Sequence, residues 1–236
     1  MAVTVAALAA VACFCMGASA STPVDIRDVP YHVRVRSLLP NGTHILCGGS
    51  ILSDRIVLTA AHCTDGKDVS SLTVRAGSAD RARGGQELPV ARVFQDPRWT
   101  EATKDFDVSV LQLEGRITFG DTARPIALVA PLTEQPTGSR GLVAGWGRSS
   151  GDGIPSETLG SALLQYIDRL PCRRAFVKGR ITPRMVCYGG VVGPACDVST
   201  NLMAFFNTKK KTPRDLRRRE QRVSDGSFVN FVGKPF

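Results

Sequence analysis

Short apolar runs separated by turn residues are the feature that most restricts the fold of this 236-residue chain. Between about Pro30 and Cys196 these runs recur, and several alternate apolar and polar side chains, as in residues 32–36, 72–75 and 108–113. Clusters of Gly, Pro, Asn and Asp separate the runs, and no long segment shows the 3.6-residue period of an amphipathic helix. The pattern predicts an all-β fold, either a sandwich or a barrel.

The N-terminus has the composition of an export signal. Residues 1–20 are apolar and rich in small side chains, and they end in Ala18-Ser19-Ala20, which predicts a signal peptide cleaved after Ala20. No other stretch approaches the length of a membrane span. We therefore expect a secreted, extracellular protein that is not held in a membrane.

Positive charge is concentrated at the C-terminus. The formal net charge is +9, and residues 201–236 hold nine Lys/Arg against three acidic residues, which accounts for +6 of it. Residues 197–236 are predicted to be a disordered basic tail, since they have few apolar side chains and no alternation. An acidic polysaccharide is the partner that such a tail would suit, whereas no nucleic-acid-binding module is present.

One histidine has the context of a catalytic base. His62 lies directly beside Cys63 at the end of an apolar run, and Cys47 lies sixteen positions upstream. A histidine can serve as a general base near neutral pH when a partner fixes its tautomer and orientation. The segments Leu46–Leu52 and Ile56–Cys63 resemble, almost letter for letter, the first catalytic motif of the chymotrypsin/trypsin family of serine proteases.

The same resemblance selects an aspartate. Asp105 and Asp107 both precede an alternating strand, and in the family the orienting aspartate opens that strand, which favours Asp107. Further segments that resemble the family lie at residues 28–33, 143–147 and 171–187, so that the resemblance extends over about residues 24–196.

The resemblance implies a fold and an activity. The expected architecture is chymotrypsin-like, with two six-stranded antiparallel Greek-key barrels in a domain over residues 21–196. Barrel 1 would cover about 24–130, and barrel 2 would begin at about 131 and be incomplete. The class hydrolyses peptide bonds of protein or peptide substrates by acyl transfer, without a cofactor or metal ion. The resemblance leaves the oligomeric state open.

The segment that should carry the nucleophile departs from the family. There, the cysteine matched by Cys196 is followed by a Gly-Asp-Ser-Gly-Gly motif, which occurs nowhere in this sequence. By spacing, Thr200 takes the place of the serine and Ser199 that of the aspartate. Val198 takes the place of the first glycine, and both Val198 and Asn201 have Cβ atoms where the loop needs the conformational freedom of glycine. Neither Ser199 nor Thr200 is therefore expected to act as a nucleophile.

Two modifications are expected in an exported chain. Five cysteines remain after signal cleavage, and their natural pairs are Cys47–Cys63 and Cys172–Cys187, which leaves Cys196 alone. Asn41-Gly42-Thr43 is an N-glycosylation sequon in a turn.

Three hypotheses follow from these observations. In the first, the sequence departs from the true reading frame near Cys196 and omits a short segment at its start, so that the natural product is an active endopeptidase. In the second, the chain is a non-catalytic homologue that binds through its surface and basic tail. In the third, the tail binds nucleic acid, which export argues against.

Overall fold

The computed structural model describes residues 22–128, 136–147, 155–175, 181–190 and 230–231. Within these residues the chain is predominantly β, with one α-helix and three 3-10 helices. The elements, in chain order, are β1 (Thr22–Pro23), η1 (Ile26–Asp28), β2 (His32–Leu38), β3 (His44–Ile51), β4 (Ile56–Thr59), η2 (Ala61–Cys63), η3 (Val69–Ser71), β5 (Leu72–Ala76), β6 (Gln86–Gln95), β7 (Ser109–Leu113), β8 (Arg140–Gly145), β9 (Gly160–Ile167), α1 (Arg169–Ala175), β10 (Met185–Gly190) and β11 (Asn230–Phe231).

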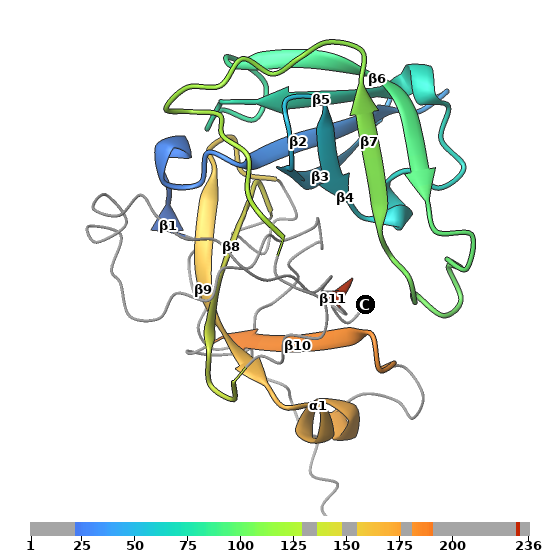
Figure 1. Cartoon of the computed structure of the whole chain (residues 1–236), viewed down its shortest axis with the longest axis vertical. Coiled ribbons are helices and arrows are strands. Elements are labelled where there is room, and N and C mark those ends of the chain that lie inside the picture. Colours follow the sequence, from blue (N-terminus) through green and yellow to red (C-terminus); the bar gives the residue numbers. More distant parts are fainter. Residues whose placement is uncertain (1–21, 129–135, 148–154, 176–180, 191–229, 232–236) are drawn as a thin grey trace, which may run out of the picture.

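Strands β2 to β7 form a closed antiparallel barrel in the order β2-β3-β4-β7-β6-β5, at the top of the molecule in Figure 1. Alternation decides which side chains enter its core. In β5 and β7 every second residue is buried, because successive side chains of a strand point to opposite faces. The inward residues are mostly β-branched or leucine, such as Val33, Val74 and Leu111, each fully buried.

The barrel closes tightly around Gly49 of β3. A Cβ atom at this position would lie 2.9 Å from the carbonyl oxygen of Leu58 and 3.0 Å from methyl groups of Val33 and Val57. The second glycine of the Cys47-Gly48-Gly49 motif is therefore required by packing between neighbouring strands.

A second sheet lies below the barrel (Figure 1). Its order is β1-β9-β10-β11, with β8 paired to β9, and it is open over the described part of the chain. Two short strands add to it: Thr22–Pro23 pairs antiparallel with β9, and Asn230–Phe231 of the tail pairs parallel with β10. The predicted all-β class, with a six-stranded antiparallel barrel and a second β unit, is confirmed.

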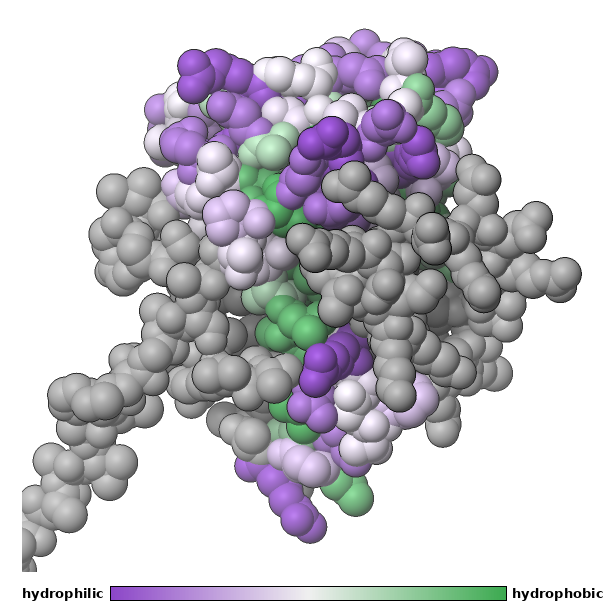
Figure 2. Space-filling model, turned by 90° about the vertical axis from the view of Figure 1, so that its left-hand side faces the viewer, coloured by the Kyte–Doolittle hydropathy of each residue, from purple (hydrophilic) through white to green (hydrophobic). Residues whose placement is uncertain are grey.

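Two apolar clusters support the second sheet. The first joins the N-terminal segment to β8 and includes Ile26, Tyr31 and Ala144. The second surrounds the disulfide at the foot of the sheet and includes Ile181 and Met185. In Figure 2 a hydrophobic strip runs between the hydrophilic barrel end and the lower part of the face shown.

Helix α1 was not indicated by the sequence pattern. The signal segment and the tail, apart from Asn230–Phe231, lie outside the described residues. Among the described residues, no helix combines the length and the apolar character needed to cross a bilayer.

Candidate active site

His62 is held by the end of a barrel strand and by a disulfide. Strand β4 ends at Thr59, and the chain turns into the 3-10 helix η2, with His62 at its centre. The next residue, Cys63, is buried and bonded to Cys47 of β3. The backbone that carries His62 is therefore tied to two adjacent strands.

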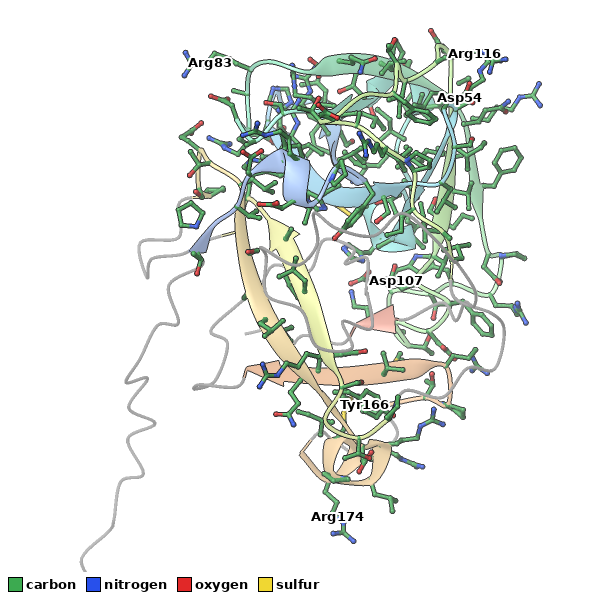
Figure 3. The ribbon with its side chains drawn as sticks, turned by 60° about the vertical axis from the view of Figure 1, so that its left-hand side comes forward. Asp54, Arg83, Asp107, Arg116, Tyr166 and Arg174 are labelled. Atoms are coloured by element: carbon green, nitrogen blue, oxygen red, sulfur yellow. A yellow bond between two sulfur atoms is a disulfide. The ribbon has the colours of Figure 1, made fainter. Side chains whose placement is uncertain are left out.

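Asp107 reaches the same place from the neighbouring strand. Strand β7 pairs antiparallel with β4, with Thr59 opposite Ser109. Residues that follow β4 therefore meet residues that precede β7, and Asp107 lies where the barrel meets the second sheet (Figure 3). A separation of 45 positions in the chain becomes a direct contact.

The two side chains are joined at two points. Oδ1 of Asp107 accepts a hydrogen bond from the backbone N of His62 at 2.8 Å, and Oδ2 lies 2.7 Å from ring Nδ1. The aspartate side chain is 12% exposed and the histidine side chain 27%. A carboxylate only accepts, so Nδ1 carries the proton, and the basic lone pair is directed to Nε2. This is the arrangement of a general base and its orienting acid.

Three neighbours of the pair were not anticipated from the sequence. The hydroxyl of Thr64 donates to Oγ of Ser109 at 2.9 Å, and both residues are buried beside the histidine segment. The ring of Trp99 lies 6.5 Å from that of His62, centre to centre. No sequence signal marks these residues, because their roles depend on the pairing of β4 with β7.

Asp105 fastens the aspartate loop to the second sheet. It accepts hydrogen bonds from the Thr182 hydroxyl at 2.9 Å and from Nε of Arg184 at 3.1 Å. These bonds, led by those from Arg184, hold the pKa of the buried Asp105 carboxyl below its usual value. Phe106, at φ 56°, carries its ring beneath the guanidinium groups of Arg98 and Arg184. Asp105, which was not selected as the catalytic aspartate from the sequence, is therefore a structural link between this loop and the second sheet.

The same region contains possible metal ligands. The ligand atoms of Cys47, His62 and Cys63 lie within 4.8 Å of one another. Thiolates bind metal, but these sulfurs are joined in a disulfide, so they do not offer thiolate ligands. The cluster fits a structural bridge beneath the histidine and not a metal centre.

The other predicted residues fall into three groups. Cys172 and Cys187 are bonded to each other. Asn41 is exposed, and its Oδ1 accepts from the backbone N and the hydroxyl of Thr43 at 3.0 and 2.6 Å. Ser199, Thr200 and Cys196 lie outside the described residues.

Comparison with known proteins assigns the family. The family model described as Trypsin matches residues 21–197. The chain belongs to this family. It is 38% identical over 170 residues to Trypsin 5G1 of Aedes aegypti, which covers 70% of this chain and 61% of that protein. It is 34% identical to Trypsin of Simulium vittatum, covering 72% of this chain and 69% of that one.

Among solved structures, the Trypsin-family chain is similar to the scabies mite inactivated protease paralogue S-I1. The TM-score is 0.66 and the identity 28%, over 73% of this chain and 76% of the other. The shared fold agrees with the barrel and second sheet described above.

Proposed function

We propose that this protein is a non-hydrolytic member of the Trypsin family. The proposal rests on a contrast between two observations. His62 and Asp107 form an oriented pair, but the sequence after Cys196 contains no Gly-Asp-Ser-Gly-Gly motif. The pair supplies a base and its orienter. Without the serine of that motif, the acyl intermediate of this class is not expected to form.

The expected loss of activity is large. Removing the nucleophile of a serine peptidase lowers turnover by about 10⁶-fold, because nucleophile, base and acid act as one unit. Ser199 and Thr200 do not replace it, since the side chains at Val198 and Asn201 restrict the backbone that must present a nucleophile. His62 then serves as a polar group in a binding surface.

The proposed role is binding outside the cell. Protein or peptide ligands of the kind that proteases recognise are one expected class, and an acidic polysaccharide on the basic tail is the other. The scabies mite relative is an inactivated protease paralogue, which supports the existence of such members. Signal cleavage after Ala20, the domain limits 21–196 and glycosylation at Asn41 are part of this proposal.

A second candidate is an active endopeptidase with a different C-terminus. Cys196 has no cysteine after it, although its family counterpart has a later partner, and the composition changes abruptly at that residue. Sequencing the native transcript across the Cys196 codon tests this candidate. A Gly-Asp-Ser-Gly-Gly codon run supports it, whereas a secreted peptide from residues 223–234 supports the non-hydrolytic chain.

Peptide hydrolysis tests the proposal directly. The purified chain and its His62→Ala variant are assayed against a mixture of fluorogenic peptides, with bovine trypsin as the positive control. Equal, background-level rates for both proteins are expected. A rate that falls in His62→Ala would show a working catalytic base and refute the proposal.

A further inference from the structure

Three strands of the barrel place charged side chains side by side on one outer face. In the β2–β5 pairing Arg34 lies opposite Arg75, and in the β5–β6 pairing Arg75 lies opposite Glu87. In the next row Arg36 lies opposite Thr73. Side chains at opposite positions share a face of the sheet and interact. These five residues are called here the arginine face.

Three guanidinium groups on this face share one carboxylate. Oε1 of Glu87 lies 3.1 Å from Nη2 of Arg34 and 3.3 Å from Nη2 of Arg36, and Oε2 contacts Arg75. The Thr73 hydroxyl donates to Oε1 at 3.1 Å. One negative charge therefore faces three positive charges. Arg34 and Arg75 are like charges directly opposite each other, an arrangement that destabilises a sheet unless an anion compensates it.

This positive charge is partly removed from water. The side chains of Arg34, Arg75 and Arg36 are 6%, 14% and 34% exposed. Burial, followed by repulsion from Arg75, lowers the pKa of Arg34. Backbone carbonyls fix the orientation of two of the groups, since Arg34 donates to Arg81 and Arg75 donates to Gly84. The donors are thus preorganised, and screening by solvent is weaker than at an open surface.

The adjacent loop does not supply the missing negative charge. Its Arg81 pairs with Glu157 and its Arg83 pairs with Asp80, so each positive charge there has one carboxylate. The excess on the arginine face remains two positive charges.

We infer that the arginine face is a binding site for a sulfated polysaccharide. Guanidinium groups donate two parallel hydrogen bonds to oxyanions. The Arg36 side chain, 34% exposed, is the most accessible guanidinium of this face, and the less exposed Arg75 beside it adds its positive charge. A bound acidic peptide would need several apolar anchors on this face. Among the described residues, Leu38 at the end of β2 is the exposed large apolar side chain beside it, and a single such anchor does not favour a peptide. The inference does not depend on whether the His62 site is catalytic.

The test uses the full chain and heparin as the probe, with affinity measured at fixed ionic strength. The double variant Arg36→Gln/Arg75→Gln is expected to bind heparin at least about 10-fold more weakly, because two charge-assisted donors are lost. The matched control is Arg116→Gln/Arg124→Gln, which removes two guanidiniums that pair with aspartates elsewhere. Figure 3 shows Arg116 on the opposite side of the barrel from Arg83. Equal weakening in both double variants would overturn the inference.

A gain of binding provides a second test that does not rely on a damaged face. Glu87→Gln keeps the shape and the acceptor for Thr73 but removes the competing carboxylate, so heparin should bind more tightly. Unchanged or weaker binding in Glu87→Gln would contradict the inference. The variant Lys209→Gln/Lys210→Gln/Lys211→Gln distinguishes heparin binding by the tail from binding by the arginine face. In this background, Arg36→Gln/Arg75→Gln should still weaken binding. If the tail variant alone abolishes binding, or if polyglutamate binds as tightly as heparin, the site is not the one inferred.

Discussion

Asp105 and Arg184 are 79 positions apart in the chain and form an ion pair between the loop before β7 and the segment before β10. The carboxylate is buried, while the guanidinium is half exposed and lies over the ring of Phe106. Because Asp107 lies two residues further on, the link fixes the loop that orients His62. Order in the second sheet and order in the His62–Asp107 pair are therefore coupled.

Asp105→Asn should loosen this loop. The amide cannot pair with Arg184 as a charge, and the lost charge-assisted bonds should lower the free energy of unfolding by about 1–3 kcal/mol. Hydrogen exchange should accelerate in residues 104–108 and 181–185 together. Asp121→Asn is the control, since its ion pair with Arg124 is exposed, and it should leave exchange unchanged. Faster exchange in only one of the two segments would contradict the coupling.

The same substitution predicts a pH dependence. The pKa of Asp105 is lowered in the folded state, so its contribution is complete above the unfolded value of about 3.9 and disappears as the pH falls through the lower folded value. The stability difference between the parent chain and Asp105→Asn should thus be constant from pH 5 to 7 and should shrink below about pH 4. A difference that grows on acidification would be inconsistent with this sign.

His32 should make the fold sensitive to mild acid. It is buried, its ring lies 5.3 Å from that of Trp146, and burial lowers its pKa to about 4. The unfolded chain takes up the proton near pH 6.5, so stability should fall between about pH 6.5 and 4, by about 2 kcal/mol at pH 5. Urea denaturation of His32→Gln should lack this slope, whereas His44→Gln, at an exposed site, should retain it. A slope that persists in His32→Gln would assign the sensitivity to other groups.

Gly49→Ala should strain the barrel beneath the histidine. The added methyl would lie 2.9 Å from the Leu58 carbonyl oxygen and 3.0 Å from Val33, and overpacking of this kind costs about 1–3 kcal/mol. Gly145→Ala is the matched control, because nothing lies within 4 Å of its Cβ position. The midpoints of thermal unfolding of the two variants test this prediction, and the midpoint of Gly49→Ala should be the lower one. Equal midpoints would show that the packing at Gly49 is looser than described.

The sequence predicted what local patterns encode. Alternation predicted the barrel strands, and a family motif predicted that His62 and Asp107 belong together. Strand pairing decides the rest. Asp105 meets Arg184, and three arginines meet Glu87, only after distant segments are brought into register, and no single segment carries that information.

Covalent labelling tests most directly whether the His62–Asp107 pair activates a nucleophile in a chain that has no Gly-Asp-Ser-Gly-Gly motif. The purified chain is treated with a fluorescent fluorophosphonate, beside bovine trypsin and the His62→Ala variant, and labelled peptides are mapped by mass spectrometry. We expect no label above the His62→Ala background, while trypsin is labelled to completion. Stoichiometric labelling of Ser199, Thr200 or any other residue, lost in His62→Ala, would contradict it.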